Sequence, residues 1–269
     1  MGAKTLEPAA PLDAPARAPS SVRRYGSISR QPLMSLALVL PLLLTYEAGV
    51  LLLGAEAVRN GADVWLRQFL DGLGFAQHVQ YFLLPAATIG ILLGWHHLTH
   101  EPWTISREVL AGMVCESVVW AVLLVGLAQL QGEVSRRWGL PVPRAAVESA
   151  VPVALEDATK SLVGRIIGYC GAGIYEEVLF RLILLSACGA ILRFFFGPAR
   201  WTAVAAVLAS SVVFSAAHYV GPHGEPFQMY SFVFRFLAGG MFAILFVLRG
   251  FGIAVGTHAA YDLIVGVFF

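Results

Sequence analysis

The chain has 269 residues, of which 58% are hydrophobic and only 13% are charged, and its formal net charge is +1 at pH 7. Soluble domains carry about 25% charged residues, so this composition excludes an ordinary soluble globular protein. The charge is nearly balanced and no basic stripe with interleaved aromatic residues appears, so no nucleic-acid partner is expected. The composition predicts an all-α, polytopic membrane protein.

The N-terminal segment differs from the rest of the chain. Residues 1–30 are rich in Ala, Pro, Ser and Arg and have no apolar periodicity, which predicts a disordered tail. No apolar run directly follows the basic residues at the extreme N-terminus, so a cleaved signal peptide is not expected.

Seven apolar stretches follow, most of them about 20 residues long, the length that crosses a hydrocarbon core of about 30 Å. They lie near residues 33–54, 79–98, 106–130, 161–195, 201–219, 230–249 and 252–269. The fourth is long enough for a tilted helix with an amphipathic lead-in. Residues 70–72, between the first two stretches, are expected in a loop. Residues 131–160 carry balanced charges, and parts of this segment are expected at the membrane interface.

The orientation follows from lysine and arginine in the short loops, which favour the cytoplasmic side. Five basic residues precede the first span: Lys4, Arg17, Arg23, Arg24 and Arg30. The loop of residues 221–230 has no Lys or Arg and fits the outer side. We therefore expect an integral, multi-pass membrane protein with a cytoplasmic N-terminus, in the inner membrane if the source is bacterial.

Ionisable residues inside a spanning helix cost about 3 kcal/mol each on insertion, so they mark candidate functional sites. Nine of them lie in or beside the apolar stretches: Glu47, Glu116, Glu176, Glu177, Arg181, His218, Arg235, His258 and Asp262. Glu47 and Glu116 stand alone on different helices and are expected to be neutral, hydrogen-bonded core acids. Arg235 lies near a helix end and is expected to extend its charge to the interface.

Glu176, Glu177 and Arg181 form an E-E-x-x-x-R group in the fourth span. At about 100° per residue, Glu177 and Arg181 are i,i+4 neighbours on one helix face and are expected to pair. Glu176 is turned about 100° away from Glu177, so the arginine leaves it without a charge partner. A structural ion pair needs one glutamate and not two. Glu176 is therefore the candidate catalyst.

Two histidines on later spans supply further polar groups. F-S-A-A-H places Phe214 and His218 on one face of the fifth span, and H-A-A-Y-D places His258 and Asp262 on one face of the last span. A single histidine in an apolar helix is usually a hydrogen-bonded core residue. Two histidines and an unpaired glutamate on three helices of one bundle favour a shared site. We expect Glu176, His218 and His258 to converge.

Two kinds of hydrolytic centre use one glutamate and two histidines. In the first, Glu176 takes a proton from water, and His218 or His258 polarises or protonates the scissile amide. In the second, the same three side chains bind a catalytic zinc ion with an open position for water. The residues leave both alternatives open. Four other histidines are expected elsewhere, near the interfaces or in loops: His96, His97, His100 and His223.

The three motifs E-E-V-L-F-R, F-S-A-A-H and H-A-A-Y-D resemble E-E-x-x-x-R, F-x-x-x-H and H-x-x-x-N/D of the CPBP family of intramembrane proteases. This family includes the type II CAAX prenyl endopeptidases and bacterial bacteriocin-processing or immunity (Abi-like) proteins. Each motif alone is weak, but all three in order on successive late spans are a specific signal. The resemblance covers roughly residues 160–269 and not the first three spans.

The resemblance implies a fold and a set of roles. Residues 31–269 would form one intramembrane protease domain of about seven to eight transmembrane helices around a polar cavity. Glu176 would activate water, and His218 and His258 would complete the centre. Three further motif residues are implied to support them: Glu177, Arg181 and Phe214.

Asp262 departs from the pattern of the eukaryotic members, which have asparagine at this position. An amide donates to an oxyanion, whereas an ionised carboxylate cannot. Asp262, counted with the catalytic residues, is therefore expected either to orient His258 or to be protonated through burial.

We therefore expect an intramembrane endopeptidase, with zinc as the one cofactor considered. Its partners would be the lipid bilayer and a membrane-associated peptide or protein substrate, either a CAAX-like tail or another sorting or maturation peptide. The alternative is a non-enzymatic membrane protein, an immunity factor or a transporter, that uses the buried charges for partner binding or ion passage. A transporter of inverted repeats would show paired broken helices in its two halves, and the sequence has no such repeat.

Overall fold

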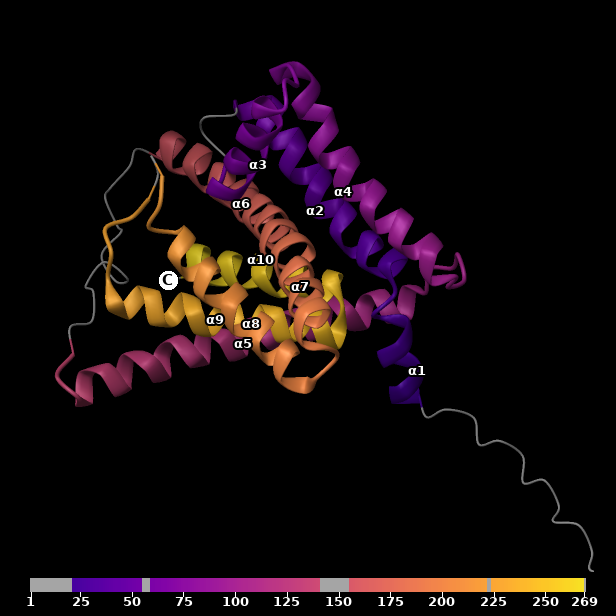
Figure 1. The fold of residues 1–269 in the computed structure, drawn as a ribbon. Helices are drawn as coiled ribbons and strands as arrows, with labels where there is room; N and C mark the ends of the chain where they lie inside the picture. The colour runs from indigo at the N-terminus through magenta and orange to yellow at the C-terminus, as the bar shows by residue number, and fades with distance from the viewer. Residues whose placement is uncertain (1–20, 55–58, 141–154, 222–223, 269) are drawn as a thin grey trace, which may run out of the picture.

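The computed structural model of the protein describes residues 21–54, 59–140, 155–221 and 224–268, and no β-strand occurs among them. The prediction of an all-α fold is confirmed (Figure 1). The helices are α1 (Ser21–Ile28), α2 (Pro32–Leu53), α3 (Gly61–Gly72), α4 (Gln77–Thr99), α5 (Arg107–Arg137), α6 (Leu155–Glu177), the π-helical η3 (Val178–Leu185), α7 (Ser186–Phe196), α8 (Arg200–Ala217), α9 (Met229–Arg249) and α10 (Phe251–Phe268).

Within the described parts of the chain, seven helical segments are long and apolar enough to cross a membrane. The fourth of them is the continuous run Leu162–Phe196, which contains parts of α6 together with η3 and α7. The seven segments coincide with the seven predicted spans, and α5 continues beyond the predicted end to Arg137. The prediction of a multi-pass membrane protein is therefore confirmed at the level of the helices.

Two helices lie where the sequence predicted no regular structure. Ser21–Ile28 form α1, within the stretch that was expected to be a disordered tail; residues 1–20 lie outside the described residues. Residues 70–72 were expected in a loop but end α3, a short helix capped by Asn60, whose side chain accepts a hydrogen bond from the backbone N–H of Asp63 (2.8 Å). Both helices are too short and too polar to resemble membrane spans, so the apolar pattern of the sequence does not reveal them.

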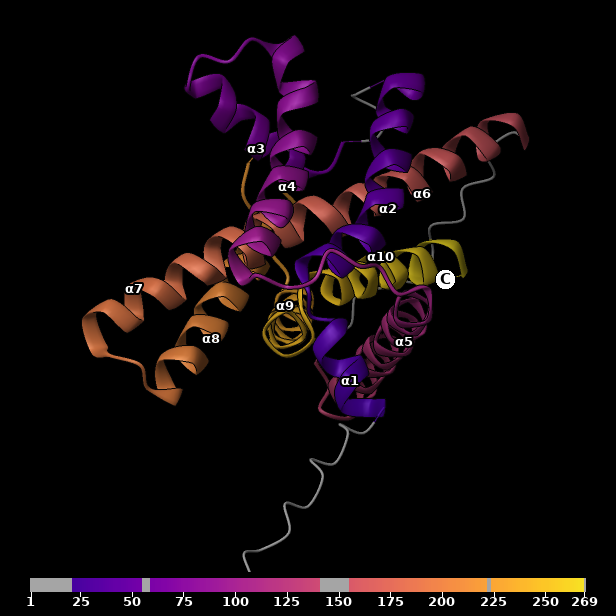
Figure 2. The same ribbon diagram turned by 90° about the vertical axis from the view of Figure 1, so that its right-hand side faces the viewer.

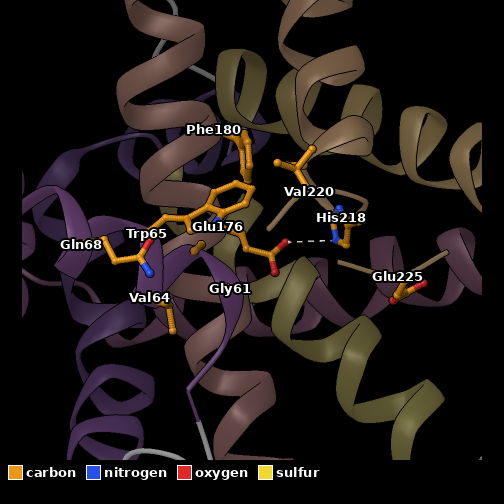
Figure 3. Close-up of a pocket in the computed structure, with 11 residues that line it drawn as sticks. Gly61, Val64, Trp65, Gln68, Glu176, Phe180, His218, Val220 and Glu225 are labelled. Carbon is orange, nitrogen blue, oxygen red and sulfur yellow. Dashed lines mark ion pairs between the residues drawn. The ribbon is translucent and has the colours of Figure 1, made fainter. Parts of the chain in front are cut away.

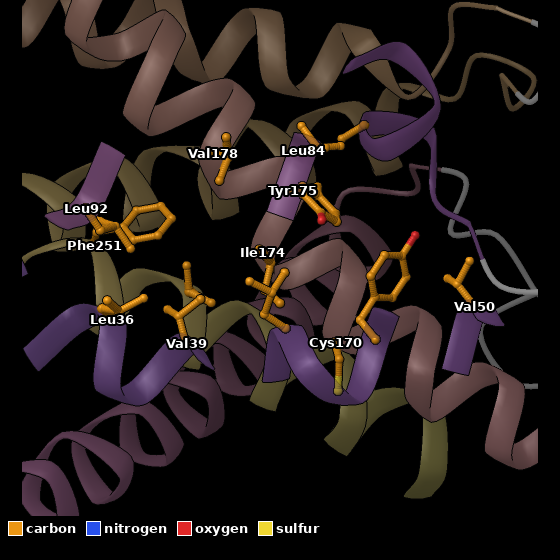
Figure 4. Close-up of a cluster of buried hydrophobic side chains, with 14 of the residues drawn as sticks. Leu36, Val39, Val50, Leu84, Leu92, Cys170, Ile174, Tyr175, Val178 and Phe251 are labelled. Carbon is orange, nitrogen blue, oxygen red and sulfur yellow. The ribbon is translucent and has the colours of Figure 1, made fainter. Parts of the chain in front are cut away.

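The C-terminal helix α10 lies at the centre of the bundle and packs against α2, α5, α6 and α9 (Figures 1 and 2). A buried apolar cluster joins its first turn to α2, α4 and α6 (Figure 4). Four fully buried members come from these four helices: Val39, Leu92, Ile174 and Phe251. Because lipid is as apolar as these side chains, close packing rather than removal from water stabilises such a contact within a membrane.

Glycine allows α6 and α10 to approach closely. A Cβ at Gly173 would lie 2.8 Å from the backbone nitrogen and from the Cβ of Ala259, which is closer than real Cβ atoms come. Gly173 precedes Glu176 by three residues and Ala259 directly follows His258. The contact therefore sets the distance between the helices that carry these two side chains.

The helices cross rather than run parallel. In both views α6 passes α9 at a steep angle (Figures 1 and 2). Parallel helices would place His218, at the end of α8, about 15 Å in depth from His258, near the start of α10, at a rise of 1.5 Å per residue. Both nevertheless approach Glu176. The crossing of the helices removes the mismatch that their sequence positions suggest.

Candidate functional site

The fourth span changes its helical form directly after its two glutamates. α6 is α-helical to Glu177 and continues as η3, whose π-helical hydrogen bonds span five residues instead of four. Such segments are rare inside α-helices and occur frequently at functional sites. Glu177 and Arg181 still pair, with Arg181 Nε 3.1 Å from Glu177 Oε2. The sequence pattern carried no sign of the π-helix.

Glu177 and Arg181 form a buried ion pair, as predicted, and both are fully inaccessible to solvent. Arg181 also donates from Nη2 to the backbone carbonyl oxygen of Gly239 (3.1 Å). Its guanidinium carbon lies 4.3 Å from the centre of the Phe214 ring, a cation–π distance. The charge of Glu177 is thereby neutralised inside the protein.

One carboxylate oxygen of Glu176 has no hydrogen bond. This atom, Oε2, is buried and has no hydrogen-bond partner among the described residues. It lies 3.9 Å from His218 Nε2 and 3.8 Å from His258 Nε2. The predicted convergence of these three side chains from three helices is therefore confirmed.

Both histidines are oriented through their Nδ1 atoms. His258 Nδ1 lies 2.8 Å from Glu177 Oε1, and His218 Nδ1 lies 2.9 Å from the backbone carbonyl oxygen of Phe214. A carbonyl oxygen and a carboxylate only accept hydrogen bonds, so each Nδ1 carries its proton and donates it. The Nε2 atoms thus remain available on the side of Glu176, as acceptors when the rings are neutral and as donors when they are protonated.

Glu177 therefore has a second function that the sequence did not indicate: it positions His258. Asp262, which was considered for this task, lies 3.6 Å from the other ring nitrogen, Nε2. Its side chain is about a fifth exposed, whereas Glu177 is fully buried. Asp262 is thus placed beside the nitrogen that faces Glu176.

Aromatic rings enclose the two histidines. The Phe242 ring is stacked on His258, with centroids 4.5 Å apart and planes 10° apart. Phe214 meets His218 edge-on at 5.1 Å and lies 6.2 Å from His258. Phe214 was expected as a supporting residue, but Phe242 lies in an apolar run of α9 and has no motif that distinguishes it.

A pocket of about 150 Å³ opens beside Glu176 and His218 (Figure 3). It is lined by residues of α3, α6, η3, the end of α8 and the segment that follows α8: Gly61, Ala62, Val64, Trp65, Gln68, Glu176, Phe180, Ala217, His218, Val220 and Glu225. The sequence predicted a polar cavity on which Glu176, His218 and His258 converge, but the lining of this pocket is mostly apolar and does not include His258. The sequence also did not predict that α3 forms one of its walls.

The three side chains are spaced more widely than the ligands of a bound zinc ion. Around a tetrahedral zinc, ligand atoms 2.0–2.1 Å from the metal lie about 3.4 Å apart. The two separations from Glu176 Oε2, 3.9 and 3.8 Å, are wider. Across the ranges that the structure covers, no group of three or more His, Cys, Asp or Glu side chains is arranged to hold a metal ion. The zinc alternative stays a prediction for a chelator assay to test.

Glu47 was expected to stand alone as a neutral, hydrogen-bonded core acid; it is hydrogen-bonded, but it does not stand alone. Tyr175, the neighbour of Glu176, donates its hydroxyl hydrogen to Glu47 Oε1, and Arg67 Nη2 of α3 lies 3.7 Å from the same oxygen. Arg67 Nε also bonds Asp63 Oδ1 at 2.6 Å. Burial acts to lower the pKa of Arg67, but the negative charge of Asp63 and its hydrogen bond raise it above the ordinary value. A buried ionic cluster thus joins α2, α3 and α6.

Glu116 was likewise expected to stand alone, but it forms a bidentate ion pair with Arg249. Nε of Arg249 lies 2.6 Å from Oε1 of Glu116, and Nη2 lies 2.7 Å from Oε2. Tyr25 of α1 donates its hydroxyl hydrogen to the same carboxylate (2.7 Å). Partial burial and this bond raise the pKa of Tyr25 to about 12. The group attaches α1 to α5 and to the end of α9.

Arg235 also has a partner instead of reaching the interface alone: its Nη2 lies 2.7 Å from Glu225 Oε1. Three of the four histidines that were expected elsewhere, His96, His97 and His100, are described and take no part in the contacts of the site. His96 packs edge-on against Trp103, and His97 lies near His100, the residue that caps α4. His223 is outside the described residues.

Comparison with known protein families matches the C-terminal part of the chain. Residues 158–264 match the family model named Rce1-like, which is described as 'Type II CAAX prenyl endopeptidase Rce1-like'. No curated protein and no solved structure matches the chain. The matched segment contains all three motifs and confirms the resemblance that they predicted.

Proposed function

We propose that this chain, whose residues 158–264 match the Rce1-like family model and support a protein of the CPBP family, is an intramembrane endopeptidase whose general base is Glu176. One observation carries this assignment. A buried carboxylate oxygen of Glu176, with no hydrogen-bond partner in the described part of the chain, lies near the Nε2 atoms of two histidines whose Nδ1 atoms are hydrogen-bonded. Two atoms 3.9 Å apart can both hydrogen-bond to one water molecule at the usual distance of about 2.8 Å, and in our proposal the attacking water bridges Glu176 and a histidine in this way.

The reaction follows from these positions. Glu176 takes a proton from water while the water oxygen attacks the scissile carbonyl carbon. The negative charge that develops on the carbonyl oxygen is stabilised by a protonated histidine Nε2, since Nδ1 of each ring already donates elsewhere. Glu176 then returns its proton to the leaving nitrogen as the C–N bond breaks, which leaves a carboxylic acid and an amine.

The two adjacent glutamates have different roles in this proposal. Glu177, bound to Arg181 and His258, keeps the imidazole in one orientation. Arg181 neutralises Glu177 without a comparable contact to Glu176. Glu176 is thus left as the carboxylate of the pair that reaches the pocket. The substrate is a peptide or protein whose cleavage site lies close to its own membrane-bound segment, either a CAAX-like tail or another sorting or maturation peptide.

The decisive variant is Glu176→Gln, which preserves size and removes the base. The purified protein in liposomes is incubated with a library of lipid-anchored peptides, and the products are identified by mass spectrometry. We expect Glu176→Gln to retain its fold and to lose roughly 10²–10⁴-fold in turnover, the usual contribution of acid–base catalysis. Glu108→Gln, an exposed position at the start of α5, is the matched control.

Two results would contradict the proposal. Cleavage by Glu176→Gln at the wild-type rate would remove Glu176 from the mechanism. Failure of the wild-type protein to cleave any peptide would favour the non-enzymatic alternative, an immunity factor or a transporter. The same assay with a chelator tests zinc: we expect turnover to persist, because the three side chains are not arranged as a zinc ligand set.

A further inference from the structure

The short helix α3 presents two different faces. At about 100° per residue, Asp63 and Arg67 fall on one side, and Val64, Trp65 and Gln68 fall on another, on average more than 90° away. The first side is buried and charged, with Asp63 fully inaccessible and Arg67 5% exposed. The second lines the pocket beside Glu176 (Figure 3). A 12-residue helix thus joins a buried ionic cluster to the candidate active site.

The charged face fixes α3 in place. Asp63 accepts hydrogen bonds from Tyr46 of α2 (2.7 Å) and from Arg67 (2.6 Å). Arg67 donates to the backbone carbonyl oxygen of Gln80 in α4 (2.8 Å). Buried charges cost several kcal/mol unless geometry and hydrogen bonding compensate, and they are a poor means of gaining stability alone. Their consequence here is a defined position for α3 against α2 and α4.

The pocket face is chemically distinct. Beside Glu176 and His218, the lining is mostly apolar, with Val64 and Trp65 from α3 and Phe180 from η3. Gln68 is an exposed amide on the same face. A volume of about 150 Å³ corresponds to an apolar cavity that holds one benzene-sized molecule. The space therefore suits a single aliphatic or aromatic side chain.

We propose that α3 is the substrate-specificity element of this protein. Val64 and Trp65 bind one apolar side chain of the substrate beside the scissile bond, and the amide of Gln68 hydrogen-bonds the substrate main chain. The inference rests on the proposed peptidase function. Because α3 lies outside residues 158–264, the hydrolytic centre and the selection of substrate come from different parts of the chain.

The test uses the lipid-anchored peptide library with each position beside the scissile bond varied from alanine to tryptophan. Wild-type protein should prefer medium-sized apolar residues at one position. Trp65→Ala enlarges the pocket and should change the ratio of kcat/KM for large over small residues by at least about tenfold. Trp65→Phe should change it less. Phe69→Ala is the control: Phe69 is on the same helix, is 66% exposed and does not line the pocket.

An independent measurement separates this inference from the proposed function. Cysteine is placed at Val64 or at Phe69 in Glu176→Gln protein whose three native cysteines are replaced by alanine. The added thiol is labelled with and without the best-cleaved peptide or, if none is cleaved, with the whole library. We expect the peptide to protect Val64→Cys and not Phe69→Cys.

Each outcome decides one question. An unchanged preference in Trp65→Ala, with cleavage intact, would overturn the role of α3 and leave the peptidase assignment standing. If no peptide is cleaved but peptide protects Val64→Cys, the peptidase assignment is overturned and α3 is still a peptide-binding site. Equal labelling at both positions with and without peptide would overturn the peptide site.

Discussion

At the scale of single residues, two adjacent glutamates have opposite environments. Glu177 is fully buried, paired with Arg181 and bonded to His258. Glu176 is partly exposed, and its Oε2 has no hydrogen-bond partner in the described structure. The difference follows from the turn of about 100° between successive helical residues. One carboxylate therefore stabilises the site, and the other is free to react with what enters it.

Arg181→Ala tests this division. It leaves the charge of Glu177 buried without its guanidinium, and breaking a buried pair from one side costs about 3–5 kcal/mol. We expect a lower melting temperature and a lower yield in addition to lost activity, whereas Glu176→Gln should melt like the wild-type protein. Arg181→Lys should be intermediate, because an ammonium keeps the charge but not the planar set of donors. A stable Arg181→Ala protein with slower turnover alone would instead place Arg181 in the reaction.

At the scale of secondary-structure elements, the site depends on how closely α6 and α10 approach. Gly173 leaves no room for a Cβ, which would lie 2.8 Å from Ala259. Gly164 lies earlier in α6 and a Cβ there would meet nothing within 4 Å. The two glycines thus differ in environment while sharing one helix.

We expect Gly173→Ala to push α6 from α10, to lower the melting temperature and to reduce turnover, because the distance from His258 to Glu176 increases. Gly164→Ala should be neutral or stabilise the helix by up to about 1 kcal/mol, the usual difference between alanine and glycine. Thermal melts of both variants in detergent, with turnover measured in parallel, check this. Equal effects of the two substitutions would contradict the prediction, because they would show that α6 and α10 accommodate a Cβ beside Ala259 without loss of stability or turnover.

At the scale of the whole molecule, the order of the helices places the pocket relative to the membrane. If each of the seven spans crosses once, the connections after α2 and after α8 lie on the same side, opposite to α1. These two connections supply most of the pocket lining, including Trp65 and Glu225. The basic residues before α2 favour a cytoplasmic α1. The pocket would then open on the non-cytoplasmic side.

Thiol labelling of intact cells tests this topology, in protein without native cysteines. Phe227→Cys, in the connection after α8, should react with a membrane-impermeant reagent, and Ser27→Cys, in α1, should react only after permeabilisation. Both native side chains are exposed, so neither position is shielded by the protein. Reaction of Ser27→Cys alone in intact cells would show the opposite orientation. Reaction of both positions would contradict an odd number of membrane crossings between them.

The sequence by itself determined the class of fold, the seven spans and the central residues of the candidate site. These depend on local properties: apolar length sets a span, and helical spacing places Glu177 beside Arg181. Glu176, His218 and His258 could be selected because each ionisable group inside a span is costly and the three occur in recognisable motifs.

Only the tertiary structure decided which groups became partners. Glu47 and Glu116 appeared isolated because Arg67 and Arg249, which pair with them, lie outside any local pattern. The contact of Glu177 with His258 joins residues 81 positions apart. The second wall of the pocket comes from α3, a helix too short and too polar to be recognised from its apolar pattern. Such pairings depend on how helices cross, and crossing is set by side-chain packing between distant segments rather than by the order of residues within one.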